Sequence, residues 1–527
     1  MTEQEQLEQE KFELERIEKQ FAQCGHPVVC EEVHEEEIML PMEDGISLRT
    51  IIYRPELEGQ IPVIVVRTCY PNNDYIYRAT AREYSRRGFA YIYQYCRGSG
   101  GSEGEWEPNV NERADGKCMI DWVCGLPWAG NVGYWGCSYL ALTGWLIADI
   151  FPEKVKTMYL THYGTFRHVS AYKDGLFRHD VLTAWAMENA GYPVTADYLE
   201  SCRFRPHAEV DERLWGKKLE WYRKWVTSTD ASDEYWNTGV WGLLKEIPSR
   251  VKVPIYMGEG WYDHHLGSAI ETYRSLSEEA KKKSKFVIGA WDHNFNVVVK
   301  GHQGEHFEND DILRAFDWFY EILMEGKMPE GSIDTYIIGE DKWYQRADYD
   351  LENQEEYRLW LGAERSLLAK QGEEGVEEFT FCPENPVSTH GAESLLATAQ
   401  EQGSQEESTK AAEAGSGQSS GGAGESEEKQ VLSVTTWDND SSPQFQAVID
   451  AYEAENPNVE IKVIDTSADE YNNSLGISLS AAQPDPDVIW VKDMGSMLQM
   501  ADKEQLLPID DFIAKDNFDL SIYKGAA

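Results

Sequence analysis

The stretch NVGYWGCSYLALTGW, residues 131–145, contains the pattern that decides the fold. A short apolar run ends at Cys137, Ser138 follows, and an apolar helical pattern continues to about residue 148. This order of strand, tight turn and helix is typical of a nucleophile elbow, in which a serine hydroxyl projects above the end of a strand. The usual pattern G-x-S-x-G departs at Leu140, where the second Gly is expected. A serine after a strand also fits a helix N-cap, so the elbow needs further support.

On both sides of this stretch, apolar strand-like runs alternate with helix-like segments. This alternation predicts an α/β fold in which helices cover a parallel sheet. The predicted strands are residues 62–68, 89–95, 132–136, 157–162, 253–260 and 285–290. Between the fourth and fifth strands, residues 164–244 are aromatic-rich and helical in period, which predicts an inserted helical cap.

A serine nucleophile needs a base to take its proton and a carboxylate to orient that base. Asp263 follows the fifth predicted strand and His293 follows the sixth, so both come just past the carboxyl end of a strand, in the chain order Ser, Asp, His. We therefore predict Ser138, Asp263 and His293 as a catalytic triad. His264 and His265 compete as the base, and Asp292 competes as the acid.

Five motifs in order then resemble one family. They are RTCY at 67–70, YQYCRGSGGSEGEW at 93–106, GCSYLA at 136–141, GWYD at 260–263 and WDHN at 291–294. Over about residues 35–396 the chain resembles the cocaine-esterase and X-prolyl dipeptidyl-peptidase family of serine hydrolases. That family implies an α/β-hydrolase core with a helical cap and a C-terminal β jelly roll.

The resemblance also implies roles for individual residues. It makes Ser138 the nucleophile, His293 the general base and Asp263 the orienting acid. It builds an oxyanion hole from the backbone N–H of Tyr139 and the phenol of Tyr70. The sequence departs from the family at Tyr95, where Asp is usual, and at Ala141, where Gly is usual. The change at Tyr95 bears on the hydrogen bonds around Arg97.

The expected organisation has six parts. They are a charged N-terminal helix at 1–34, the hydrolase core at 35–163 and 245–330, the cap at 164–244, a truncated jelly roll at 331–397, a disordered linker at 398–430, and a partial lobe at 431–527. The linker is rich in Gly, Ser and Glu and lacks core-forming residues. A jelly roll needs about eight strands, and only its beginning is present.

The last part resembles the amino end of the extracellular sugar-binding proteins of ABC importers, an α/β fold. Only one partial lobe is present, so a hydrolase joined to it indicates either a gene fusion or an artefact of sequence assembly. Two alternatives therefore stand beside an esterase or acylase. One is an X-prolyl dipeptidyl aminopeptidase, which needs a cap carboxylate such as Asp174, Asp180 or Glu188 for the substrate ammonium. The other is a non-catalytic sugar-binding protein.

Composition limits the partners. A net charge of -45 argues against binding nucleic acid, and no apolar run has the roughly 20 residues that a membrane-spanning helix needs. The nine cysteines match neither a disulfide scaffold nor a zinc pair, so we expect reduced thiols and a cytoplasmic location. No cofactor or metal is predicted, since the pairs at 264–265 and 305–306 lack ligand spacing. The expected substrate is a small ester, an amide or a short peptide, and no oligomeric state is indicated.

Overall fold

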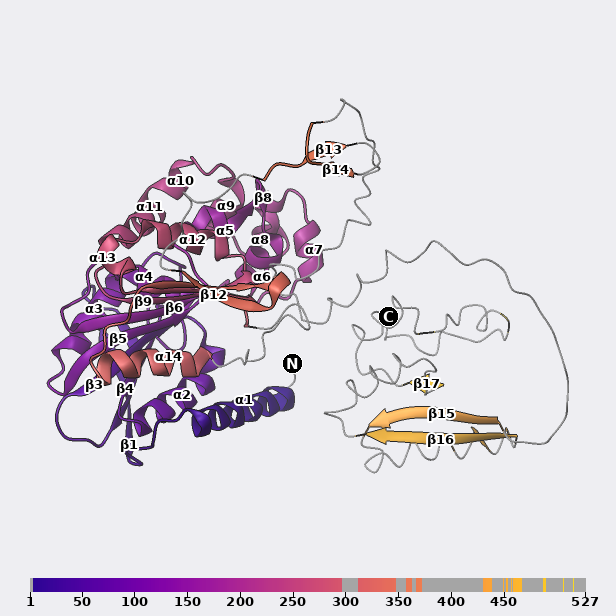
Figure 1. Cartoon of the computed structure of the whole chain (residues 1–527), viewed down its shortest axis with the longest axis horizontal. Coiled ribbons are helices and arrows are strands. Elements are labelled where there is room, and N and C mark those ends of the chain that lie inside the picture. Colours follow the sequence, from indigo (N-terminus) through magenta and orange to yellow (C-terminus); the bar gives the residue numbers. More distant parts are fainter. Residues whose placement is uncertain are drawn as a thin grey trace. The chain divides into compact units, whose positions relative to one another are not determined.

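The chain divides into two compact units, Met1–Ala399 and Gln400–Ala527 (Figure 1). The computed structural model describes residues 3–295, 311–346, 357–362 and 366–371 of the first unit, and residues 430–437, 458–466 and 487–489 with a few single positions of the second. No helix within these described ranges is both long and apolar enough to cross a membrane.

A ten-stranded sheet forms the centre of the first unit. Its strands lie in the order β1-β2-β4-β3-β5-β6-β9-β10-β11-β12. Their bounds are β1 Val33–Pro41, β2 Ser47–Pro55, β3 Ile61–Thr68, β4 Ala90–Tyr95, β5 Ala129–Cys137, β6 Val155–Thr161, β9 Ile255–Tyr262, β10 Lys285–Asp292, β11 Ser332–Ile337 and β12 Lys342–Arg346. From β4 through β11 neighbouring strands are parallel, while β1, β2 and β12 pair antiparallel. All six predicted strands are present, and the predicted α/β class is confirmed.

The sheet is buried on both faces, which explains its continuous apolar runs. On β3, Val63 and Val65 belong to the core on one face, whereas Ile64 and Val66 belong to the core on the other. Successive side chains of a strand point to opposite faces, so a strand between two helical layers has to be apolar throughout.

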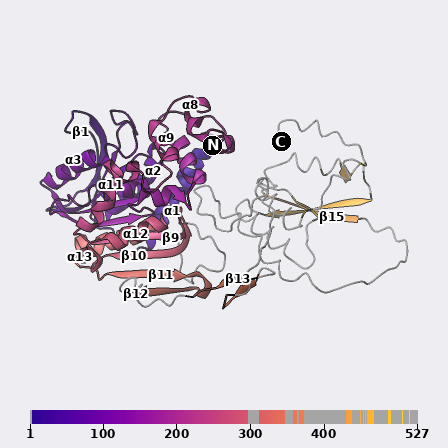
Figure 2. The same cartoon turned by 90° about the horizontal axis from the view of Figure 1, so that it is seen from above.

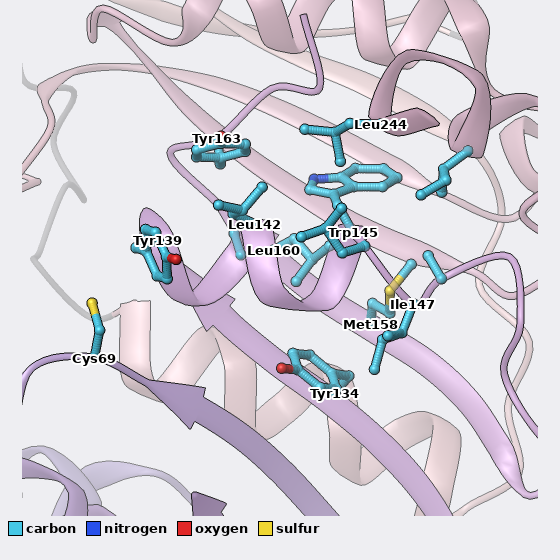
Figure 3. Packing of buried hydrophobic residues seen from close by; sticks show 14 of the residues in the cluster. Cys69, Tyr134, Tyr139, Leu142, Trp145, Ile147, Met158, Leu160, Tyr163 and Leu244 are labelled. Carbon is cyan, nitrogen blue, oxygen red and sulfur yellow. The ribbon is translucent and has the colours of Figure 1, made fainter. Parts of the chain in front are cut away.

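Helices cover each face. One core contains residues of α1 (Glu3–Gln23), α2 (Asp74–Arg86) and α14 (Asp311–Phe319), which lie on the same side of the sheet in Figure 1. The other contains residues of α3 (Glu112–Gly125), α4 (Tyr139–Trp145), α12 (Leu266–Ser275) and α13 (Glu278–Lys281). In this second core, Leu142 and Trp145 of α4 pack with Met158 and Leu160 of β6 (Figure 3).

A set of cap elements occupies the chain between β6 and β9. It consists of short helices and one small hairpin, β7–β8. Its elements are α5 Arg167–Ala171, β7 Tyr172–Lys173, β8 Leu176–Phe177, a π-helix at His179–Thr183, α6 Ala184–Glu188, α7 Tyr198–Arg203, a 3-10 turn at His207–Glu209, α8 Val210–Arg213, α9 Glu220–Thr227, α10 Glu234–Asn237, α11 Gly239–Glu246 and a 3-10 turn at Ile247–Arg250. Aromatic residues form much of its interior, including Tyr222, Trp225, Trp236 and Trp241, all buried.

The structure corrects the predicted start of the jelly roll at residue 331. Strand β11 pairs in parallel with β10, and β12 pairs with β11, so residues 332–346 extend the hydrolase sheet at its edge (Figure 2). In the sequence these short β-like runs resemble the start of a separate β domain. The pattern of side chains predicts a strand but does not show with which other strand it pairs. Residues β13 Trp360–Gly362 and β14 Ser366–Leu368 form a separate two-stranded pair. The rest of the predicted jelly roll lies outside the described residues.

The second unit contains a small parallel sheet in the order β16-β15-β17. Its strands are β15 Gln430–Trp437, β16 Val459–Thr466 and β17 Val488–Ile489. A parallel sheet agrees with the α/β fold that the resemblance implies for this partial lobe. Almost all of the predicted linker, up to residue 429, lies outside the described residues.

Candidate active site

Ser138 occupies a tight turn between β5 and α4. Its backbone has φ 56° and ψ −124°, in the left-handed region that side chains rarely adopt. The turn is held by a 2.9 Å hydrogen bond from the Ser138 amide to the Thr161 carbonyl oxygen of β6. Gly136 is required here, because a Cβ atom at this position would lie 2.3 Å from the Leu140 carbonyl oxygen. Strand, turn and helix therefore meet as in a nucleophile elbow.

Three side chains that are distant in sequence form one hydrogen-bonded chain. His293 Nε2 lies 2.9 Å from Ser138 Oγ, and His293 Nδ1 lies 2.7 Å from Asp263 Oδ2. Asp263 is 2% exposed and His293 is 8% exposed, so the carboxylate is screened from water while the imidazole reaches the hydroxyl. This geometry lets the imidazole accept the serine proton while the carboxylate fixes its orientation.

The competing residues lie elsewhere in the network. The amide of His265 donates a 2.6 Å hydrogen bond to Asp263 Oδ1, and its ring nitrogen lies 2.8 Å from Ser170 Oγ. Asp292 accepts a 2.8 Å hydrogen bond from the Asn294 amide. Burial lowers the pKa of His264 and of His265 well below the usual range, so both rings are neutral at neutral pH.

Two buried groups beside the carboxylate were not predicted. Burial opposes the charge of Asp263, but the surrounding histidines outweigh it and hold its pKa well below the usual range. Burial and the charge of Asp263 raise the pKa of Glu259 well above the usual range, so Glu259 keeps its proton. His162 has a left-handed backbone (φ 52°), and its Nδ1 lies 3.8 Å from Asp263 Oδ2. Burial lowers the pKa of His162 to about 4.

His162, Asp263 and His293 offer ligand atoms that all lie within 4.8 Å of one another. A metal ion could be held by such a set, but the 2.7 Å bond between His293 and Asp263 already engages two of its atoms. No sequence signal identified His162 or Glu259, because each lies within a strand-like run and both depend on tertiary contacts.

The two predicted oxyanion residues follow neighbouring strands of the sheet, Tyr139 after β5 and Tyr70 after β3. Tyr139 is the first residue of α4; its phenol donates a 2.6 Å hydrogen bond to Glu112 Oε1 and accepts a 2.8 Å bond from the Asn109 amide. Tyr70 follows β3, and its hydroxyl accepts a 3.0 Å bond from Trp185 Nε1 of the cap. Burial raises the pKa of the Tyr70 phenol well above 10, so it remains a donor at any physiological pH.

The family-like motif residues contact one another beneath the site. Arg67 Nε donates a 3.0 Å hydrogen bond to Gln94 Oε1, which joins the first motif to the second. Arg97 makes a two-pronged contact with Asp115 at 2.8 and 2.7 Å. Tyr95, the departure from the family pattern, instead donates a hydrogen bond to Asp74. The substitution therefore leaves the ion pair of Arg97 intact.

A narrow cavity of about 30 Å³ opens at Ser138. It is lined by residues of the elbow, the strand ends and the cap: Asn109, Ser138, Tyr139, Tyr163, Arg167, Val181, Leu182, Trp185, Trp225, His264, His265 and His293. Tyr70 is not among the lining residues, although its partner Trp185 is. Figure 3 shows Tyr139 and Tyr163 among the packed residues of the buried core.

The parallel sheet, the elbow at Ser138 and the covering cap define a hydrolase with an α/β-hydrolase fold. Residues 44–294 match the model described as X-Pro dipeptidyl-peptidase (S15 family). This match and the ordered motifs together support the predicted resemblance of residues 44–294 to the cocaine-esterase and X-Pro dipeptidyl-peptidase (S15) family. Residues 437–526 match the model described as bacterial extracellular solute-binding protein, which confirms the second resemblance.

Individual relatives agree with the family. The chain is 23% identical to cocaine esterase from Rhodococcus sp. (strain MB1 Bresler) over 404 residues, 68% of this chain and 69% of that protein. An alpha-amino acid ester hydrolase superposes with a TM-score of 0.55 at 21% identity, covering 68% of this chain and 67% of that one. An aminopeptidase from the marine sediment archaeon Thaumarchaeota archaeon gives 0.52 at 18% identity, covering 65% and 63%. These two structures share the fold.

Proposed function

We propose that the enzyme cleaves an ester or amide bond through an acyl-enzyme intermediate on Ser138. The observation that supports this most directly is the chain of contacts from Ser138 Oγ to His293 and on to Asp263, at 2.9 and 2.7 Å. In the first step His293 takes the hydroxyl proton as Oγ attacks the substrate carbonyl carbon, and then gives that proton to the leaving group. In the second step His293 activates a water molecule, which releases the acyl group and restores the serine.

The negative charge on the carbonyl oxygen requires donors. The Tyr139 backbone N–H and the Tyr70 hydroxyl are the donors that we propose, since Tyr139 directly follows the nucleophile and Tyr70 keeps its proton. The Tyr70 oxygen accepts a hydrogen bond from Trp185, and its own proton, which faces the Cys69 side chain, is the one that would turn to the oxyanion.

The lining of the cavity favours an acyl ester over an X-Pro dipeptide. The cap acids that an aminopeptidase would use for the substrate ammonium, Asp174, Asp180 and Glu188, are not among the described residues that line it. A short-chain acyl ester is therefore the preferred substrate in this proposal.

Covalent labelling tests the proposal. A fluorophosphonate should modify the purified chain at Ser138, and Ser138→Ala should abolish both labelling and turnover of a chromogenic short-chain ester. Labelling at another serine, with turnover retained in Ser138→Ala, contradicts the assignment. An X-Pro anilide measured beside the ester separates the peptidase alternative. Sugar-dependent fluorescence tests binding by the second unit.

We also infer a cytoplasmic location for the hydrolase. The eight cysteines within the described residues are all free thiols, as expected in a reducing compartment. Fractionation of the producing cells checks this inference, and recovery of the chain outside the cytoplasm contradicts it.

A further inference from the structure

Arg167 is a buried cation in the wall of the active-site cavity. It begins α5, the first helix of the cap, and is 8% exposed. It lines the same cavity as Ser138 and His293. Its guanidinium carbon lies 4.7 Å from the ring centre of Trp225 and 5.9 Å from that of Trp241, so the two indoles hold it in place.

This cation has no acidic partner. Within the part of the chain that the structure describes, Arg167 forms no ion pair with a carboxylate, and its Nε has no hydrogen-bond partner. Its polar neighbour is the phenol of Tyr163, a neutral group. The other two buried arginines of the described ranges are paired: Arg67 lies 3.8 Å from Asp115, and Arg87 lies 2.5 Å from Glu83.

The charge of the cavity follows from Arg167 alone. No carboxylate is among the described residues that line it, and Arg167 carries its one permanent charge. The adjacent rings of His264 and His265 are neutral because burial lowers their pKa values. A protein with a net charge of -45 thus presents an unpaired cation beside its nucleophile. A buried charge without a partner is costly, so an anionic group from outside the chain is the expected partner.

We propose that Arg167 determines specificity by binding a carboxylate of the substrate, so that the enzyme prefers esters or amides that carry one. This inference rests on the proposed hydrolysis at Ser138 and adds the chemical class of the substrate. A guanidinium suits this role because its planar N–H groups can pair with both oxygens of a carboxylate. The preference is opposite to that of an aminopeptidase, whose substrate brings an ammonium group.

Paired esters that differ only in charge test the inference. One pair is 4-nitrophenyl hemisuccinate and its methyl ester, with the charge on the acyl group. The other pair is 4-acetoxybenzoate and methyl 4-acetoxybenzoate. In this pair the carboxylate lies on the leaving group. In at least one pair the acid should have the higher kcat/KM, and added salt should reduce this preference. Equal or opposite preference in both pairs overturns the inference and leaves hydrolysis at Ser138 intact.

Variants test whether Arg167 causes the preference for the acid substrate. Arg167→Gln should lower the ratio of acid to methyl ester kcat/KM by about 100-fold, whereas Arg167→Lys should retain part of it. Arg213→Gln removes the same charge from an exposed position of the cap, paired with Glu209, and should leave the ratio unchanged. A purely structural role for Arg167 would lower both rates together and leave the ratio unchanged, which contradicts the proposal.

Binding measurements on a catalytically inactive variant separate this inference from the proposed function. Ser138→Ala should bind the preferred acid in calorimetry, and the additional change Arg167→Gln should weaken that binding about 100-fold. If this result appears while the native chain hydrolyses none of the four esters, the carboxylate site stands and the proposed reaction is wrong. If Arg167→Gln does not change the binding, the carboxylate site is wrong.

Discussion

The Tyr70 hydroxyl accepts a 3.0 Å hydrogen bond from Trp185 Nε1, and this contact joins the end of β3 to helix α6 of the cap. The indole nitrogen can only donate, so the direction of the bond is fixed. The Tyr70 proton therefore points to a different acceptor. A cap residue thus controls the orientation of a group that we propose to stabilise the reaction intermediate.

Tyr70→Phe should lower kcat by about 100- to 1000-fold while KM and melting temperature change little. The substitution keeps the ring and its packing but removes a donor to the developing oxyanion. Steady-state kinetics with a short-chain ester measure the effect. Tyr53→Phe is the matched control, because its phenol donates to Glu35 near the sheet edge, and it should not alter kcat. An unchanged kcat in Tyr70→Phe would leave Tyr70 as a packing residue.

Trp185→Phe should act through Tyr70. Loss of the indole N–H frees the phenol to rotate, so kcat should fall by about tenfold. A double-mutant cycle measures the coupling: in the Tyr70→Phe background, Trp185→Phe should have almost no further effect on kcat. Additive losses would show that the two residues act independently.

His293→Ala should reduce kcat by several orders of magnitude at an unchanged fold, since it removes the base that contacts Ser138. His264→Ala removes a neutral ring that lines the cavity and should cost at most about tenfold. Kinetics and melting curves of both variants make the comparison. If His264→Ala lost as much kcat as His293→Ala while folding normally, His293 would not be the sole base.

Glu259→Gln should stabilise the protein increasingly as the pH rises. In the folded state Glu259 has a raised pKa and keeps a proton that the unfolded chain releases above about pH 4.5. Folding stability is therefore lost as pH increases from 4.5 towards the folded pKa, by about 1.4 kcal/mol per pH unit. Gln keeps the shape without this loss. Denaturant unfolding at pH 5 and pH 8 measures the difference in free energy of unfolding between variant and native chain. The same change at an exposed position, Glu58→Gln, is the control. A stability difference independent of pH would mean that Glu259 is ionised in the fold.

Deletion of every residue after Leu396 should leave kcat/KM for a short-chain ester within about twofold. The deletion removes none of the residues that we propose as triad and oxyanion hole and none that lines the cavity, and the second unit, which begins at Gln400, is compact by itself. Enzyme kinetics and light scattering check the result. Lost activity or aggregation would show that the deleted strands cover an edge of the first unit.

The sequence predicted much of this fold, because few folds other than a helix-covered parallel sheet can bury apolar strands that alternate with helices. The elbow could be identified since Gly136 and Ser138 meet local backbone requirements that a sequence reveals. The start of the β domain was placed wrongly at residue 331, because strand β11 resembles any short strand until its pairing with β10 is known.

Arg167, Glu259 and His162 escaped prediction for another reason. Each matters through what surrounds it or fails to pair with it, and these surroundings include side chains that are distant in sequence, such as Asp263 for His162 and Trp241 for Arg167. An arginine in THYGTFRH carries no local sign that its guanidinium lies between two indoles and lacks an acid.

Strands β6 and β9 are neighbours in the sheet, paired in parallel from Met158 with Ile255 to Thr161 with Gly258. The cap begins after β6 and ends before β9, and these neighbouring strands lie about 4.8 Å apart. Recombination or grafting can therefore exchange the cap for one of different length without shifting the strands that carry Ser138 and Asp263. A chimera joined at residues 162 and 254 would keep the strands that precede Ser138 and Asp263, but its new cap would have to supply a donor to the Tyr70 hydroxyl in place of Trp185.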